Sequence, residues 1–147
     1  MIHNFEEYTS KMTYEEKQFI FPEIIKILSL AIGKEKAVKC SDIINEIESF
    51  GIVTHIVVNG KDVLKSIRTT PARVRHMIHV LRVSDTIPFL IATSQGYYIS
   101  NDVEEINTYI QSIDDRIRSI YQIMKALRRQ SKNFPNKQTY SQQQLIL

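Results

Sequence analysis

The spacing of hydrophobic residues predicts a first helix over about residues 14–32. Apolar side chains recur there at steps of three and four, the period of a helix with one buried face (Phe19, Ile20, Ile24, Ile27, Leu28 and Ala31). Thr13 and Glu16 have the spacing of a capping box, which marks the start of the helix. Pro22 is expected to kink or split it, and Gly33 to end it.

Two more predicted helices follow before residue 85. The first, over roughly 42–50, is expected to be capped by Ser41 and ended by Gly51. The second opens at Thr70-Pro71, which provides a hydroxyl at the cap and proline at the first helical position, and runs over about 70–84. Its predicted buried stripe consists of Val74, Met77, Ile78 and Leu81.

The stretch between these two helices, residues 51–69, is ambiguous. Residues 52–58 are β-branched and typical of a strand, and Asn59-Gly60 is a strong turn signal. A hairpin needs a second strand at 61–67, but the spacing of Val63, Leu64 and Ile67 favours a short helical turn. Residues 87–100 are clearer, because two short β-rich runs flank Ser94-Gln95-Gly96 and predict an antiparallel hairpin. In its second strand, Tyr97 and Tyr98 should alternate between faces.

A long helix is predicted over 101–130, with Asn101 as its cap and Glu104 three residues later. Hydrophobic residues alternate steps of three and four through about three and a half heptads, the a/d pattern of a coiled coil. They are Val103, Ile106, Ile110, Ile113, Ile117, Ile120, Met124 and Leu127. Residues 131–147 are rich in Gln, Asn and Ser, and we expect a disordered tail.

The amino-acid composition narrows the classes of protein to which this chain could belong. The chain has 147 residues, 43% hydrophobic and 24% charged, which suits a packed domain with an appended helix. Its four glycines are scattered, so no glycine-rich phosphate loop is present, and Cys40 is alone, so neither a disulfide within the chain nor a thiolate zinc cluster is expected. With no apolar run of membrane-spanning length and no secretory signal, we expect a cytoplasmic protein.

The arginines are segregated along the chain. The net charge is only +3. Residues 1–67 contain lysine but no arginine, whereas residues 68–100 contain four arginines, no lysine and one acid, Asp85. The planar guanidinium suits two-point contact with phosphate and guanine edges. This segment is therefore a candidate nucleic-acid surface, and the alternative is a solvated helix face.

Three helices followed by a hairpin is the order of a winged helix-turn-helix domain, whose third helix enters the major groove. The segments 73–82 and 87–99 resemble small uncharacterised winged-helix proteins of bacteriophages and prophages, in which a helix ending in Leu-Arg precedes a Ser-x-Gly-Tyr-Tyr wing and a long C-terminal helix. The resemblance covers roughly 70–130. The chain departs from the family pattern at 51–69, because the turn between the second and third helices is usually short. The resemblance implies DNA binding without naming a site or a process. The expected function is sequence-specific or nonspecific binding by a phage or prophage regulatory or replication-accessory protein.

The expected fold class is therefore α+β, mainly helical. A winged-helix domain over 1–100 (recognition helix about 70–84, wing 87–100) precedes an oligomerisation helix over 101–130 and a tail over 131–147. Double-stranded DNA is the expected partner, with Thr70, Arg73 and His76 ranked highest because the N-terminal end of a recognition helix reads bases. The full candidate set is Arg68, Thr70, Arg73, Arg75, His76, His79, Arg82 and Gln95. The alternatives to DNA contact are a structural role for Arg75 and Arg82 and an ordinary hairpin tip at Gln95.

The stripe over 103–127 predicts a homo-oligomer or packing on another subunit. Base rates favour a two-fold dimer, whereas isoleucine at both a and d favours three or four strands in parallel coils. A protein–protein adaptor that uses this helix, without DNA binding, is the alternative function. No cofactor and no metal are expected, since no acid or cysteine accompanies the His76/His79 pair. No catalytic activity is expected, because the acids come as surface pairs (Glu6-Glu7, Glu15-Glu16, Glu104-Glu105 and Asp114-Asp115).

Overall fold

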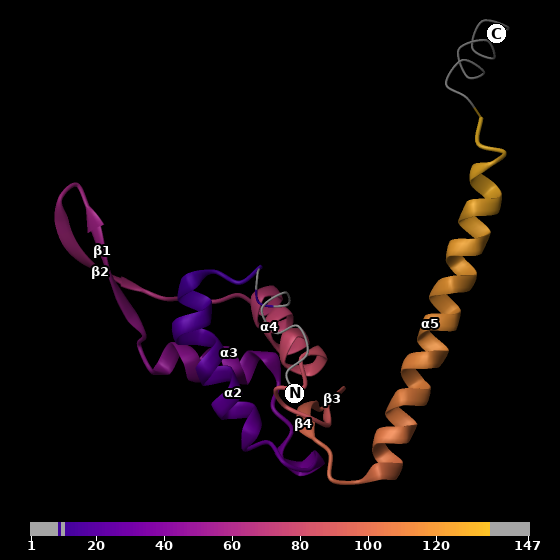
Figure 1. Ribbon diagram of the computed structural model, residues 1–147, viewed down its shortest axis with the longest axis horizontal. Coiled ribbons are helices and arrows are strands. Elements are labelled where there is room, and N and C mark those ends of the chain that lie inside the picture. Colours follow the sequence, from indigo (N-terminus) through magenta and orange to yellow (C-terminus); the bar gives the residue numbers. More distant parts are fainter. Residues whose placement is uncertain (1–8, 10, 136–147) are drawn as a thin grey trace, which may run out of the picture. The chain divides into compact units, whose positions relative to one another are not determined.

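The structure is a computed structural model that describes residue 9 and residues 11–135. Helices and two separate two-stranded antiparallel sheets make up the described part, so the chain is of the α+β class (Figure 1). The chain divides into two compact units, Met1–Ile106 and Asn107–Leu147. The tail predicted over 131–147 falls largely on 136–147, which lie outside the described residues.

The first helical stretch is confirmed at its start and shorter than predicted at its end. Its capping box is present, since the Thr13 amide donates to Glu16 and the Glu16 amide donates to Thr13 Oγ1. A π-helical segment, η1 (Glu16–Ile20), leads into α2 (Phe21–Ser29), with Pro22 in the first turn of α2. Because proline cannot donate a backbone hydrogen bond, the turn before it widens. Gly33 does not end this helix, which already stops at Ser29.

The next two helices, α3 (Cys40–Ser49) and α4 (Pro71–Val83), pack on each other and on α2. The predicted cap Ser41 is wrong, because the Lys39 amide donates to the Asp42 carboxylate and the helix begins at Cys40. The opening of α4 is as predicted, with the Arg73 amide donating to Thr70 Oγ1 at 3.3 Å. The core between these helices contains Ile24, Leu28, Ile43, Ile47, Val74, Met77, Ile78 and Leu81.

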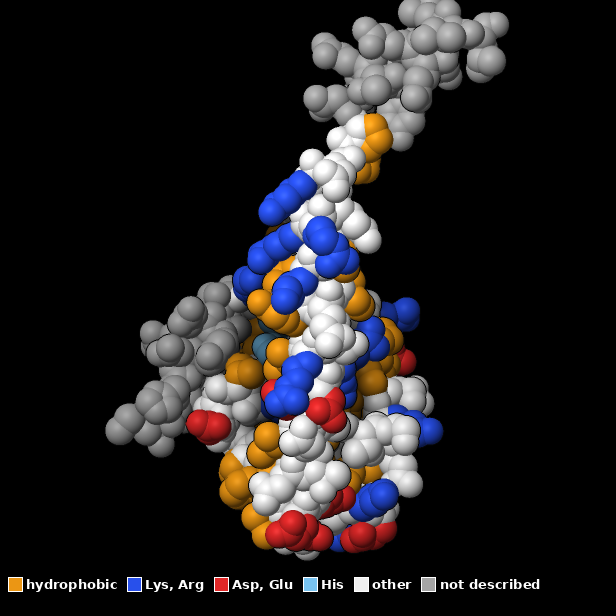
Figure 2. Space-filling view, turned by 90° about the vertical axis from the view of Figure 1, so that its right-hand side faces the viewer, with side chains coloured by type: hydrophobic (Ala, Val, Ile, Leu, Met, Phe, Trp, Pro, Cys, Tyr) orange, Lys and Arg blue, Asp and Glu red, His pale blue; other side chains and the backbone are white. Residues whose placement is uncertain are grey.

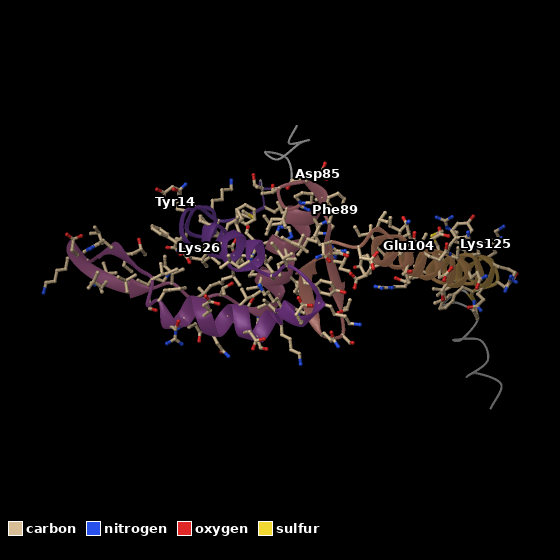
Figure 3. All side chains as sticks on the ribbon, turned by 90° about the horizontal axis from the view of Figure 1, so that it is seen from below. Tyr14, Lys26, Asp85, Phe89, Glu104 and Lys125 are labelled. Atoms are coloured by element: carbon tan, nitrogen blue, oxygen red, sulfur yellow. The ribbon has the colours of Figure 1, made fainter. Side chains whose placement is uncertain are left out.

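Residues 51–69, which the sequence leaves ambiguous, form a two-stranded ribbon, β1 (Val53–Val58) with β2 (Lys61–Ser66). The short helical turn favoured by the spacing of Val63, Leu64 and Ile67 is not formed. Asn59 and Gly60 both have positive φ, 52° and 75°, as a two-residue hairpin turn requires. The ribbon projects from the three-helix body (Figure 1). Its side chains stand out from the backbone in Figure 3. Neither Val57, 71% exposed, nor Leu64, 61% exposed, is covered by another described element.

The second sheet confirms the predicted hairpin. Strands β3 (Leu90–Thr93) and β4 (Gly96–Ile99) pair through a two-residue turn, after a connection that includes Asp85 and Phe89 (Figure 3). The segment between α2 and α3, which includes the 3-10 turn η2 (Lys34–Lys36), lies along β4. Val38 and Tyr97 exchange both backbone hydrogen bonds at 2.9 Å. As predicted, Tyr98 is buried and Tyr97 is half-buried.

The long helix α5 runs from Val103 to Ser131, 29 residues, close to the predicted 101–130. Asn101 is not its cap. The Asp102 side chain accepts from the Glu104 amide, and the Asp102 carbonyl accepts from the Ile106 amide. No residue of α5 is buried within the single described chain.

Candidate nucleic-acid interface

Arg73, one of the residues ranked highest from the sequence, lies in an ion pair at the base of α4. Its Nε donates to Glu16 Oε1 at 2.6 Å, its Nη2 donates to Glu16 Oε2, and the same Nη2 donates to the Lys11 carbonyl at 3.1 Å. Glu16 is only 7% exposed. The Arg73 contact holds the pKa of this carboxyl below its usual value and outweighs burial, which would raise it. Arg73 therefore ties the N-terminal helix to α4.

The opposite side of α4 presents the remaining cations to solvent. Arg75 and His79 are one helical turn apart and exposed, while Val74, Ile78 and Leu81 on the other side are buried. Arg68 is exposed just before the helix. Because Asp85 is the only acid between Arg68 and Ser100, this face has no carboxylate of its own element to neutralise it. The arrangement can contact an anion through two exposed side chains on one turn.

Three further candidates lie at the margins of this face. Thr70 is exposed, but its hydroxyl caps α4. His76 and Arg82 are half-buried. His76 Nε2 is buried without a hydrogen-bond partner among the described residues, and the charge of His76 contributes to lowering the pKa of Glu16. His76 is therefore placed nearer the Glu16 contact than Arg75 is, and the two histidines of the predicted pair differ in exposure.

Gln95 is exposed at the tip of the β3–β4 hairpin, as the sequence indicated. Its amide donates to Thr93 Oγ1 at 3.2 Å, which orders the turn. Gly96 follows at φ 127°, and a Cβ there would lie 2.5 Å from the Val38 carbonyl oxygen. The glycine is thus required both by its backbone angle and by the close approach of the α2–α3 segment.

The β1–β2 ribbon supplies basic residues that the sequence reading missed. Cross-strand pairing places Thr54 opposite Lys65 and Val58 opposite Lys61, so both lysines lie on one face of the ribbon. Both are exposed. The signal that could have found them is Asn59-Gly60 followed by alternating residues, which the helical reading of Val63 and Leu64 obscured.

A second carboxylate joins the hairpin to the start of α5. Glu105 accepts hydrogen bonds from the Tyr98 hydroxyl and, on its other oxygen, from Ser100 Oγ. Tyr98 is 1% exposed, and burial together with the Glu105 contact raises the pKa of Tyr98 to about 12. The Ser100 and Tyr98 hydrogen bonds lower the pKa of Glu105. The sequence assigns only Glu104, to the cap of this helix, and predicts no contact of Glu105.

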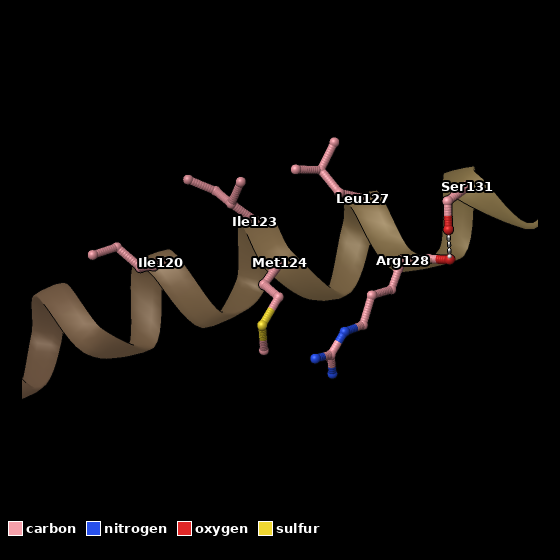
Figure 4. Close-up of a pocket in the computed structure, with 6 residues that line it drawn as sticks. All are labelled: Ile120, Ile123, Met124, Leu127, Arg128 and Ser131. Carbon is pink, nitrogen blue, oxygen red and sulfur yellow. Dashed lines mark hydrogen bonds between the residues drawn. The ribbon is translucent and has the colours of Figure 1, made fainter. Parts of the chain in front are cut away.

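The predicted oligomer stripe follows one line along α5 and is accessible in the single chain. Val103, Ile110, Ile117, Ile120 and Leu127 are each more than half exposed, and Ile106, Ile113 and Met124 are half-buried. At the C-terminal end the apolar line widens into a shallow groove lined by Ile120, Ile123, Met124, Leu127, Arg128 and Ser131 (Figure 4).

The described part of the chain contains no group of three or more His, Cys, Asp or Glu side chains placed to hold a metal ion. In the same residues, no helix has both the length and the apolar character needed to cross a membrane. Comparisons of the chain with protein-family models, with curated proteins and with solved structures each gave no match. The functional argument therefore depends on the residues themselves.

Proposed function

We propose that this protein binds double-stranded DNA through the exposed face of α4, in a winged helix-turn-helix arrangement. The observation that carries the proposal is the division of α4 into two faces. One face packs into the core, and the other presents the exposed cations Arg75 and His79, with no carboxylate on α4 itself and with Arg68 exposed just before the helix.

The order of the elements supports the same proposal. Helix α2, the segment laid along β4, helix α3, helix α4 and the β3–β4 hairpin follow one another as in winged-helix domains. Helix α4 then corresponds to the recognition helix and the hairpin, with Gln95 at its tip, to the wing. The β1–β2 ribbon is an addition between α3 and α4. The resemblance to phage and prophage proteins, and the expected regulatory or replication-accessory role, belong to this proposal.

The expected contacts divide into two kinds. Arg75 has the planar fork that suits two-point contact with guanine or with phosphate. Arg68, Lys61 and Lys65 are exposed cations that suit phosphate contact, which positions the protein without reading sequence. Arg73 is left out of the proposed contact set, because its Nε and Nη2 are already engaged by Glu16 and Lys11.

Fluorescence anisotropy with a random duplex at about 50 and 200 mM salt tests the proposal, because phosphate contacts release counterions and lose affinity steeply over this range. The double variant Arg75→Ala/His79→Ala should bind much more weakly at the lower salt. Arg129→Ala, near the C-terminal end of α5, is the control for loss of an exposed arginine. No binding by the unaltered chain at about 50 mM salt would refute the proposal, and so would equal binding by the double variant.

An adaptor function is the second candidate, favoured by the exposed stripe on α5. It predicts no DNA affinity and a partner captured through α5. The double variant Ile113→Asn/Ile117→Asn should then lose the partner, whereas Arg75→Ala/His79→Ala should keep it.

A further inference from the structure

The apolar stripe of α5 is symmetric about position 115. Val103 and Leu127 are equally far from this point, and the same holds for Ile106 with Met124, Ile110 with Ile120, and Ile113 with Ile117. In heptad terms each pair joins an a position to a d position. An antiparallel coiled coil places a residues opposite d residues of the neighbouring helix. One antiparallel register therefore matches all eight stripe residues.

The charge of α5 changes sign at the same point. Between Val103 and Asp115 the helix contains four acids and no base, and from Arg116 to its end it contains five bases and no acid. The acids are Glu104, Glu105, Asp114 and Asp115, and the bases are Arg116, Arg118, Lys125, Arg128 and Arg129. Lys and Arg side chains accordingly gather along the later part of α5 (Figure 2). In an isolated helix this order also suits the macrodipole, but it does not explain the symmetric stripe.

We infer that α5 pairs with α5 of a second copy of this chain as an antiparallel coiled coil whose two-fold axis passes beside residue 115. Each acidic half then lies along the basic half of the other helix, and every stripe residue is covered. This surface is separate from the DNA contact set on α4, and neither depends on the other. At about 1.5 Å per residue the helix is about 43 Å long, which is enough for three to four heptads of contact.

Of the charged residues beside the axis, Asp114 fits this arrangement and Arg116 is the exception. Asp114 is already paired with Arg118 of its own helix at 2.8 Å, so the approach of two copies of Asp114 is offset by two arginines on the same side. On the other side, two copies of Arg116 approach each other. A register shifted by one heptad separates these charges but leaves two stripe residues uncovered.

A parallel pair fits less well. It places the two acidic halves together and the two basic halves together. It also sets isoleucine against isoleucine at both core positions, which favours three or more strands. The antiparallel pair removes the conflict between the isoleucine pattern and a two-fold dimer, because each a residue there faces a d residue.

Disulfide crosslinking of full-length chains determines the orientation. In a Cys40→Ser background, chains with Val103→Cys are mixed with chains with Leu127→Cys that differ in mass, and the mixture is equilibrated in a glutathione buffer. The expected product is the mixed 103–127 disulfide. Predominant 103–103 and 127–127 products would overturn the proposal in favour of a parallel pair, and a monomer in sedimentation equilibrium would overturn it altogether.

Two substitutions test the packing by sedimentation without DNA. Ile117→Asn removes two central contacts per dimer and should raise the dissociation constant at least about 100-fold, whereas the outward-facing Ser119→Asn should not. Arg116→Gln should lower the dissociation constant about twofold, because it removes the like-charge approach. Weaker association of Arg116→Gln would contradict the antiparallel register. DNA binding is measured on the same Ile117→Asn protein. Binding that persists in this monomer shows that the DNA proposal does not depend on the pairing of α5, so the two proposals can fail separately.

Discussion

Arg73 and Glu16, 57 positions apart in the sequence, form a two-point ion pair that joins the first turn of α4 to the start of the N-terminal helix. The Glu16 carboxylate also accepts from the Thr13 amide at 3.0 Å, so one buried side chain caps a helix and holds a second one. Arginine is better suited than lysine to this role, because its fork reaches both carboxylate oxygens at once.

Replacing Arg73 should therefore affect stability rather than surface chemistry. Arg73→Ala leaves a buried carboxylate without its main donor, and we expect the free energy of unfolding to fall by about 1–3 kcal/mol. Arg75→Ala, two positions away on the exposed face, should change it by less than about 0.5 kcal/mol. Urea denaturation followed by circular dichroism measures both variants. Equal effects would show that the Glu16 contact contributes nothing particular to stability.

The same pair predicts acid sensitivity. The folded pKa of Glu16 is below its ordinary value of 4.5, so the contact contributes full stability above that pH and loses it as the pH falls through the folded pKa. Melting temperatures measured from neutral pH downward should fall less steeply below about 4.5 for Glu16→Gln than for the unaltered chain. An unchanged slope would exclude Glu16 as a source of the acid sensitivity. Glu105, whose pKa is also lowered, should account for part of the remaining slope.

The raised pKa of Tyr98 predicts that its phenol loses its proton at a higher pH than an ordinary tyrosine. Its pKa is raised to about 12, so the folded state retains the phenol proton that the unfolded state releases near 10. The corresponding stability is present below pH 10 and is lost as the pH rises toward 12. Tyrosinate absorbance should show a component near pH 12 that Tyr98→Phe removes and Tyr121→Phe retains. If Tyr98→Phe keeps that component, the assignment is wrong.

Two glycines provide a matched pair for backbone strain. Gly96→Ala introduces a Cβ 2.5 Å from the Val38 carbonyl oxygen at φ 127°, whereas Gly51→Ala, at φ 57°, meets nothing within 4 Å. We expect Gly51→Ala to cost about 1 kcal/mol. Gly96→Ala should cost more, about 1–3 kcal/mol from the backbone strain alone, with the clash in addition. Thermal or urea unfolding of both variants measures the difference, and an equal cost would show that the α2–α3 segment can move away from β4.

The parts of the fold predicted from sequence are those in which a local signal agrees with packing. Thr70-Pro71 defines α4, the Ser-Gln-Gly turn defines β3–β4, and the long apolar stripe defines α5. Residues 51–69 stay ambiguous in the sequence because the spacing of three hydrophobic residues competes with the turn signal of Asn59-Gly60. In a ribbon without a buried face, hydrophobic spacing gives no information about secondary structure, whereas a turn with two positive φ angles does.

At the candidate site, the difference between the sequence ranking and the structure has another cause. Arg73 ranks above Arg75 for DNA contact because it lies nearer the N-terminal end of the recognition helix. Position along the helix does not say which partner a side chain meets. The deciding partner, Glu16, was assigned from sequence only to a capping box, and its contact with Arg73 joins residues 57 positions apart. Likewise, no local pattern predicts the contacts of Glu105 with Tyr98 and Ser100, which depend on how the hairpin meets the helix.

At the base of the β1–β2 ribbon, the Ile67 amide donates a hydrogen bond to the Ile52 carbonyl at 2.8 Å. The chain therefore leaves the three-helix body and returns to it at one place. Ile67, the first residue after β2, is buried in the core. The ribbon is thus an insertion between α3 and α4 that the helix packing does not depend on. A fluorophore or an inserted peptide at Asn59-Gly60 is therefore expected to leave the packing of α3 against α4 unchanged.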